Sequence, residues 1–196
     1  YEKLIYDPVP HNLPGVLNTY CRDFSVICGS ASKAYAMTGW RCGWSIGPAS
    51  VIAAQNALQS HSTSNVSSIT QKAVVAALTG SQAPVTEMLN EYRSRRDNLY
   101  DWLTADPRIR CRKPDGAFYM FTDISDVLSP DGLRTSTDFA QALLDESRVA
   151  VTPGEAFDAP GFLRISFATS MDNLREGSRR LVEFVRQHAP RATVAG

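Results

Sequence analysis

A lysine near the start of the chain lies among residues that could activate its amine. Lys33 follows Ser30 and Ser32, and Arg41 comes eight residues later, after Gly39. A lysine amine is a nucleophile only when it is neutral, and a reference pKa of about 10.4 leaves fewer than roughly one amine in a thousand neutral at pH 7. Burial among apolar residues and a second nearby cation both lower the pKa of an amine. The segment therefore has the residue types that a reactive lysine requires.

The same segment has groups that bind a phosphate. Serine hydroxyls and backbone N–H groups donate hydrogen bonds to phosphate oxygens, and a planar arginine fork binds an oxyanion through paired hydrogen bonds. A nucleophilic amine beside a phosphate anchor is what a phosphorylated aldehyde cofactor needs. An isolated lysine is nearly always a surface residue, so Ser30, Ser32 and Lys33 alone are a weak indication, and the argument depends on the longer segment.

Strands and helices alternate around this segment. We predict a buried parallel strand at 24–28, which includes Cys28, and then a loop of small residues at 29–32 that leads to Lys33. A second strand is expected at 40–46. The other elements expected before residue 80 are helices at 49–58 and 69–78, with a polar loop at 60–68 between them.

A longer helix is expected to begin near Pro84, because proline is favoured at the first helical position. Apolar side chains recur along it at helical spacing, which predicts one buried face. Its opposite face has charged residues, Arg96 among them, and we expect that face to be solvated. Such a helix could join two domains.

The pattern after residue 105 predicts a small α+β domain. Strands are expected at 109–111 and 117–122 around a Pro-Asp-Gly turn, and another at 163–168. Thr135 with Asp138 predicts a capping box that begins one helix. The last helix is expected to be capped by Thr169 with Asp172.

Composition excludes several classes of function. The chain has 20 basic and 20 acidic residues, so its charge gives no indication of capture of nucleic acid or an anionic membrane. No apolar run reaches the roughly 18 residues of a membrane span. Four cysteines without metal-ligand spacing indicate free thiols in a reducing cytoplasm and no metal site.

The segment 30–44 resembles the pyridoxal-phosphate (PLP) attachment motif of class I/II aminotransferases, which have fold type I of the PLP-dependent transferases. The resemblance implies that Lys33 is the residue to which PLP is covalently attached, and that Ser30, Ser32 and Arg41 also bind the cofactor, Ser30 and Arg41 at its phosphate. Two departures, at Ala31 and Cys42, keep small or apolar character. The matching residues are Ser30, Ser32, Lys33, Ala36, Met37, Gly39, Arg41 and Gly43.

Other segments follow in the order that the same family has. Residues 1–4 resemble the segment whose tyrosine, here Tyr1, hydrogen-bonds the ring oxygen of the cofactor and assists catalysis. Residues 114–119 resemble a strand of the small domain, and 151–157 a Pro-Gly loop, although Asp158 stands where glycine is usual. The run 162–168 resembles the strand whose arginine, here Arg164, binds the α-carboxylate of the substrate.

The resemblance implies a domain organisation and an activity. Residues 1–75 would be the C-terminal part of the large PLP-binding domain, 76–104 a connecting helix, and 105–196 the small α+β C-terminal domain. The activity would be exchange of an amino group between an L-amino acid and a 2-oxo acid, in a cytoplasmic homodimer with shared active sites. A Ser/Thr-rich run at 59–65 resembles bacterial aspartate aminotransferases, which suggests aspartate or a similar amino acid.

Two alternatives remain open from the sequence. Other PLP enzymes of the same fold, such as carbon–sulfur lyases and cyclopropane-forming synthases, share the lysine and both arginines. The fold could also serve as a non-catalytic regulatory domain. Because these residues are shared, the motif by itself does not separate the PLP enzymes from one another. The acid that pairs with the pyridine nitrogen would lie three positions before Tyr1.

Overall fold

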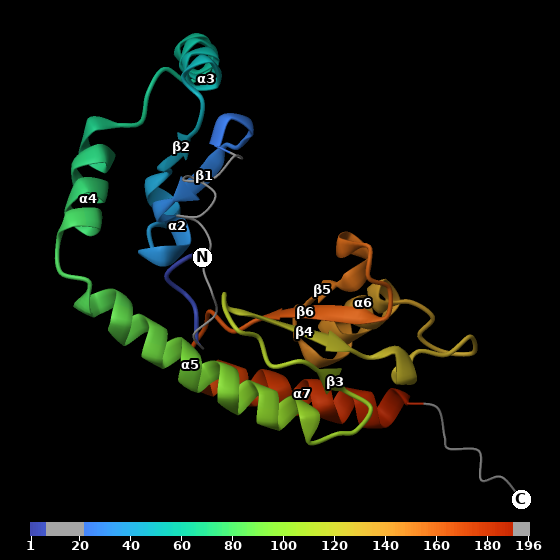
Figure 1. Ribbon diagram of the computed structural model, residues 1–196. Coiled ribbons are helices and arrows are strands. Elements are labelled where there is room, and N and C mark those ends of the chain that lie inside the picture. The colour runs from blue at the N-terminus through green and yellow to red at the C-terminus, as the bar shows by residue number, and fades with distance from the viewer. Residues whose placement is uncertain (7–21, 190–196) are drawn as a thin grey trace, which may run out of the picture. The chain divides into compact units, whose positions relative to one another are not determined.

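The computed structural model describes residues 1–6 and 22–189. These residues form two compact units, Tyr1–Leu89 and Asn90–Gly196, and the longest helix contributes to both. Among the described residues, no helix combines the length and the apolar character that crossing a membrane requires. Figure 1 shows the elements of each unit along the chain.

The first unit is built on a pair of antiparallel strands, β1 (Ile27–Ser30) and β2 (Gly43–Ile46). The prediction of a buried parallel strand at 24–28 was wrong in position, direction and burial. Phe24 is 92% exposed, and Cys28 is exposed as well. An apolar run favours a strand covered on both faces, but in the described residues no second layer covers these side chains.

Two short elements separate the strands, α2 (Ala31–Ala34) and the 3-10 turn η2 (Thr38–Trp40). Lys33 therefore lies on a helical turn and not after a loop. Ala31 and Ala34 are fully buried, and Ala31 forms a small core with Met37 and Val74.

Two longer helices follow, α3 (Ala49–Ser62) and α4 (Ser68–Thr79). The helix predicted at 49–58 exists and is one turn longer, so the expected polar loop shortens to residues 63–67. The helix predicted at 69–78 is confirmed, and Gly80 is its C-cap.

Helix α5 (Ala83–Thr104) confirms the predicted long helix but corrects one expectation about its polar face. Arg96 is 5% exposed, where solvation was expected. Its Nη1 donates to the Pro114 carbonyl oxygen at 3.1 Å, and its Nε donates to Asp97 at 3.0 Å. The buried guanidinium of Arg96 thus holds the Pro-Asp-Gly turn that joins two strands of the second unit.

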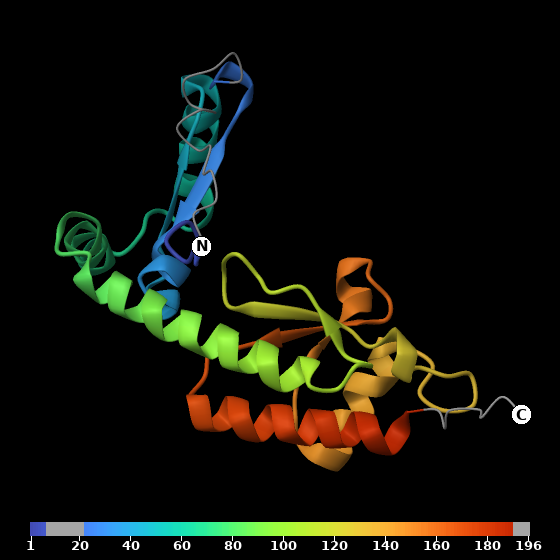
Figure 2. The ribbon, with the colours of Figure 1, turned by 60° about the horizontal axis from the view of Figure 1, so that its bottom comes forward.

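The second unit contains a four-stranded antiparallel sheet with strand order β3-β4-β6-β5. Helix α6 packs against α7 and against β5 and β6, and Figure 2 shows both helices on one side of the sheet. Phe139 of α6 meets Phe184 of α7 edge to face at 5.0 Å. The bounds of these elements are β3 (Arg110–Cys111), β4 (Tyr119–Asp123), η3 (Ser125–Val127), α6 (Ser136–Ser147), β5 (Thr152–Pro153), η4 (Gly154–Phe157), β6 (Phe162–Ser166) and α7 (Met171–His188).

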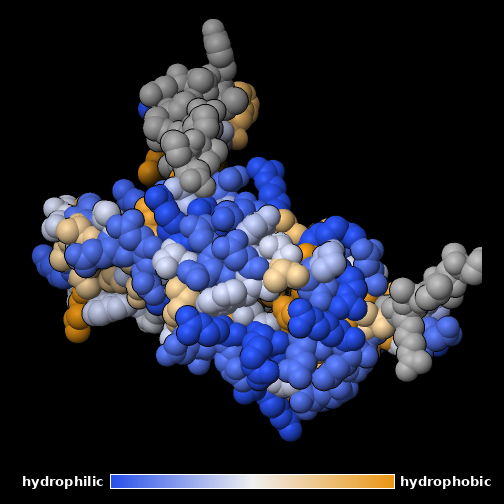
Figure 3. All heavy atoms as spheres, turned by 90° about the horizontal axis from the view of Figure 1, so that it is seen from below, coloured by the Kyte–Doolittle hydropathy of each residue, from blue (hydrophilic) through white to orange (hydrophobic). Residues whose placement is uncertain are grey.

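The two faces of this sheet differ in burial. Met120 and Leu163 point to the helices and are fully buried. Tyr119, Phe121 and Arg164 alternate with them and are only half-buried or exposed, as the period of two in a strand requires. Figure 3 shows the outer side of α7 as hydrophilic, which fits its amphipathic sequence. The half-buried sheet face is therefore the one available for chemistry.

The helix starts of this unit test two predicted caps. The Thr135 hydroxyl accepts from Asp138 N at 3.0 Å, and Asp138 accepts from Thr135 N at 3.1 Å, so the capping box is confirmed. Helix α7 is capped by Ser170, whose hydroxyl accepts from Asn173 N at 3.2 Å. The cap predicted at Thr169 was one residue too early, because two adjacent hydroxyl residues both suit the position.

Candidate active site

Ser30 links the end of β1 to the start of α2. Its Oγ accepts a hydrogen bond from Ser32 N at 3.0 Å and caps the turn, and the two hydroxyl oxygens lie 2.9 Å apart. Ala31 N donates to the Cys42 carbonyl oxygen at 3.2 Å, which fixes this turn against the segment that leads into β2. The strand-to-helix junction thus brings together the two hydroxyls predicted to bind the cofactor.

Lys33 is half-buried on α2, between the two buried alanines of the turn. Its backbone carbonyl accepts from Ala36 N at 3.3 Å, and Ala36 has a positive φ of 53°. A left-handed residue directly after the helical turn ends the helix there. The lysine is therefore held on a short, tightly closed element three residues after Ser30.

Arg41 follows η2 in the left-handed conformation, with φ 54°. Its Nη1 donates to the Thr38 carbonyl oxygen at 2.8 Å, and this is the only hydrogen bond of its side chain within residues 1–6 and 22–189. An arginine has five N–H donors, so most remain available for another acceptor. Strand pairing places Ser30 opposite Gly43, two residues after Arg41, which ties both predicted phosphate contacts to one junction.

The donors at this junction fit a phosphate group. Two hydroxyls, the backbone and an exposed guanidinium come from two adjoining strand ends. Oxyanions of phosphate accept hydrogen bonds from such donors, and a cation offsets their charge. The chemistry of the residues present is therefore compatible with a phosphorylated cofactor attached to Lys33.

Beside Ser30, the backbone of Gly29 and the indole of Trp44 lie very close together, a contact that the sequence analysis did not predict. Gly29 pairs with Trp44, and a Cβ at position 29 would collide with the indole of Trp44, including its Cζ2 at 2.8 Å. Trp44 also packs against the core around Ala31. A glycine within a strand opposite a tryptophan was the available signal, because glycine in a strand often marks such an approach.

Tyr1 belongs to the same unit as Lys33. Its side chain is partly exposed, and Leu4, three residues later, is fully buried and donates its N–H to the Tyr1 carbonyl oxygen at 2.8 Å. Figures 1 and 2 both draw the start of the chain beside α2. This arrangement is compatible with the predicted role of Tyr1 near the cofactor.

Arg164 lies on the half-buried face of β6 in the second unit. Its Cζ lies over the ring of Tyr119 at 4.5 Å and over the ring of Phe157 at 4.4 Å. Within the described residues its guanidinium makes no hydrogen bond and no ion pair. Arg108 and Arg110 of the same unit, in contrast, pair with carboxylates.

The aromatic neighbours of Arg164 were not predicted to have a role. Phe157 ends η4, and Gly154 begins it. A Cβ at Gly154 would collide with the Ala159 carbonyl oxygen and would lie 2.7 Å from that of Phe162. The available signal was the Pro-Gly loop itself, since a glycine in a turn often permits close backbone contact.

Two groups with shifted pKa values, Asp106 and Cys111, lie in the second unit. The side-chain hydrogen bond from Arg108 holds the pKa of the Asp106 carboxyl well below its usual value, with further help from Arg186. Burial raises the pKa of the Cys111 thiol to about 11. Within the described residues, no cluster of His, Cys, Asp and Glu could hold a metal ion. Neither Asp106 nor Cys111 is among the residues predicted to bind cofactor or substrate.

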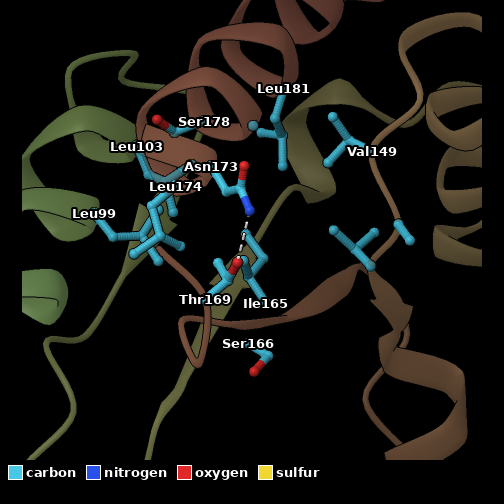
Figure 4. Close-up of a pocket in the computed structure, with 13 residues that line it drawn as sticks. Leu99, Leu103, Val149, Ile165, Ser166, Thr169, Asn173, Leu174, Ser178 and Leu181 are labelled. Carbon is cyan, nitrogen blue, oxygen red and sulfur yellow. Dashed lines mark hydrogen bonds between the residues drawn. The ribbon is translucent and has the colours of Figure 1, made fainter. Parts of the chain in front are cut away.

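A separate apolar cavity of about 140 Å³ lies between α5, α7 and β6 (Figure 4). Leucines 99, 103, 174 and 181 line it, and Asn173 Nδ2 donates to Thr169 Oγ1 at 3.0 Å across one side. Gly177 also lines it, and a Cβ added at this glycine would meet no atom within 4 Å. The cavity contains none of the residues predicted to bind cofactor or substrate.

Known proteins match this chain over nearly its whole length. The sequence profile of the family "Aminotransferase class I and II" matches residues 1–181. An aspartate aminotransferase from Geobacillus stearothermophilus is 41% identical over 189 residues, which cover 96% of this chain and 48% of that protein. An aspartate/prephenate aminotransferase from Nitrosomonas europaea is 42% identical over 167 residues, covering 82% and 42% of the two chains.

Solved structures agree with the sequence matches. The aspartate aminotransferase from Rhizobium meliloti superimposes with a TM-score of 0.89 at 39% identity, covering 97% of this chain and 48% of that one. An aromatic aminotransferase from Pyrococcus horikoshii OT3 gives a TM-score of 0.86 at 33% identity, covering 95% and 49%. The chain thus spans about half the length of the relatives it matches. The predicted resemblance and fold class are confirmed: the chain belongs to the class I and II aminotransferases and has part of the fold type I architecture.

Proposed function

We propose that this chain forms the lysine-bearing half of a PLP-dependent aminotransferase. The observation that carries the proposal is the junction of β1 and α2, where Ser30, Ser32 and Lys33 lie on one tightly closed turn. Family membership supports the same activity, because relatives at about 40% identity are named aspartate aminotransferases.

In this proposal the residues of the junction hold the cofactor. Ser30 and Arg41 would bind its phosphate through hydroxyl and guanidinium donors, Ser32 would contact the cofactor from the same turn, and Lys33 would be the residue to which it is attached. The phenol of Tyr1 donates to the ring oxygen. Bound there, PLP supplies an electron sink for the negative charge that develops at the substrate Cα.

The chemical step then depends on two residues of this chain. Arg164 binds the substrate α-carboxylate through two parallel N–H···O hydrogen bonds, which orients the Cα–H bond. The Lys33 amine would accept the proton from the Cα of the amino donor, and in the reverse half-reaction the protonated amine would give a proton to the Cα derived from the 2-oxo acid, so one group acts as base and as acid. Loss of such a positioned base typically lowers a rate by about 10²- to 10⁴-fold.

The substrates and assembly that we propose follow the relatives. The amino donor is aspartate or a similar L-amino acid, and the acceptor is a 2-oxo acid. Residues 1–75 form the C-terminal part of the cofactor-binding domain, 76–104 the connecting helix, and 105–196 the small domain. We further propose a cytoplasmic homodimer with shared active sites.

A transamination assay on the full-length natural polypeptide tests the activity. We expect L-aspartate with a 2-oxo acid to give oxaloacetate, and Lys33→Ala to lower kcat by at least about 10²-fold. Lys72→Ala is the matched control, because Lys72 is an exposed lysine on α4 of the same unit. Release of ammonia without need of a 2-oxo acid would instead identify a lyase, and no turnover with any amino acid tested would support the regulatory alternative.

A further inference from the structure

Arg164 is held by aromatic rings and not by a carboxylate. Its Cζ lies 4.5 Å from the Tyr119 ring centroid and 4.4 Å from that of Phe157. Both distances are inside the roughly 6 Å limit for a cation–π contact. Within the described residues, these rings are the only partners of the guanidinium.

Both rings are braced by other parts of the second unit. Tyr119 lies on β4 and packs against Phe118 at 4.9 Å, and Phe118 is buried. Phe157 meets Phe121 edge to face at 6.2 Å. The η4 turn that carries Phe157 is itself fastened to α6, because Glu155 Oε1 accepts from Ser136 N at 2.8 Å.

An aromatic ring and a carboxylate hold an arginine side chain in different ways. The N–H donors of a guanidinium point outward in its plane, and a carboxylate partner occupies two of them. A ring contacts the planar face instead, so the donors stay available and the positive charge is not neutralised. An arginine that must capture a carboxylate from solution benefits from this arrangement.

We propose that Tyr119 and Phe157 are positioning residues that hold the Arg164 guanidinium with its N–H edge directed at the substrate carboxylate. This inference rests on the proposed function, in which Arg164 binds that group. The rings restrict the guanidinium before the substrate arrives, so less side-chain freedom is lost on binding. Their removal should weaken substrate binding more than it slows the chemical step.

Kinetics of the full-length natural polypeptide, saturated with PLP, test this. Phe157→Leu and Tyr119→Leu should each raise KM for the amino donor about tenfold and leave kcat within about twofold, since a cation–π contact of a half-buried arginine, between the exposed and the desolvated limits, is worth about a factor of ten in affinity. Phe157→Tyr and Tyr119→Phe keep the rings and should restore KM. Trp102→Leu is the matched control, because Arg175 lies over Trp102 at 5.6 Å in the same unit.

A second readout does not depend on activity. In the NMR spectrum of the same full-length polypeptide, the Nε–Hε proton of Arg164 should resonate upfield, because its guanidinium lies over two ring faces. Phe157→Leu should shift this resonance downfield and speed the rotation of the guanidinium about its Nε–Cζ bond. Trp102→Leu should leave it in place.

Three contrary results are possible, and they differ in what they overturn. If Arg164→Lys raises KM strongly but neither leucine variant does, the rings do not position the guanidinium and the inference is overturned, while the proposed function stands. If Arg164→Lys leaves KM unchanged, Arg164 does not bind the substrate, and both the inference and that part of the proposed function fail. Equal losses of kcat in both leucine variants at unchanged KM would also overturn the inference.

Discussion

Replacement of Gly154 by alanine should destabilise the second unit severely. The added Cβ would collide with the Ala159 carbonyl oxygen and would lie 2.7 Å from the Phe162 carbonyl oxygen and 2.9 Å from Phe162 Cβ. Two of these three atoms belong to the backbone, so no flexible side chain can move aside. The turn must open to accommodate the methyl group.

The expected loss of stability follows from the hydrogen bonds that would break if the turn opened. Ala159 N donates to the Gly154 carbonyl oxygen at 3.0 Å, and Phe162 N donates to that of Ala159 at 3.3 Å. Each such hydrogen bond contributes about 1 kcal/mol, and overpacking costs about 1–3 kcal/mol. We expect a loss of about 3 kcal/mol in the free energy of unfolding and a fall in Tm of roughly 10 °C.

Gly177→Ala is the matched control for this prediction. No atom lies within 4 Å of a Cβ at that position, which is inside α7 and borders the apolar cavity. Alanine there should raise stability by about 0.5–1 kcal/mol, because glycine is unfavourable within a helix. Thermal unfolding followed by circular dichroism measures both variants. Equal Tm values for Gly154→Ala and the parent chain would refute the steric argument.

Three further predictions concern the second unit. The pKa of Asp106 is lowered in the folded state, chiefly by the side-chain hydrogen bond from Arg108. Its stabilisation is therefore fully present above the unfolded pKa of about 3.9 and is lost progressively as the pH falls from there through the lowered folded-state pKa. In urea titrations, Asp106→Asn should lower the free energy of unfolding by about 2 kcal/mol at pH 7 and by clearly less at pH 2. Thr135→Ala should cost about 1 kcal/mol in the same titrations, and an unchanged midpoint would show that the capping box is not needed. With its thiol pKa raised to about 11, Cys111 should react with iodoacetamide at pH 8 more slowly than exposed Cys28; faster reaction at Cys111 would contradict its burial.

Local sequence patterns correctly predicted those elements that depend only on residues close together in the chain. The capping box of Thr135 and Asp138 is formed by residues three apart, and the helix predicted at 69–78 was found from its own residues alone. The long helix was found from its apolar spacing, although its buried cation was not. Arg96 is buried by a contact with Pro114, eighteen residues away, which no periodicity encodes.

The direction and burial of β1 depended on the partner strand and could not be read from an apolar run. Its partner β2 pairs antiparallel with it, and the apolar side chain of Phe24 is exposed in the described residues. The resemblance to a family, and not the local pattern, identified Lys33, Arg41 and Arg164. It gave no role to Tyr119, because a ring over a guanidinium is a contact between strands.

Reduction with borohydride tests the central claim most directly. The full-length natural polypeptide is incubated with PLP, reduced, digested and mapped by mass spectrometry, with and without L-aspartate. Our account predicts a reduced cofactor adduct on Lys33 that L-aspartate depletes, and none on the exposed Lys72. A folded polypeptide that carries no adduct on Lys33, or one with adducts spread equally over its lysines, would contradict the assignment of Lys33 as the cofactor lysine.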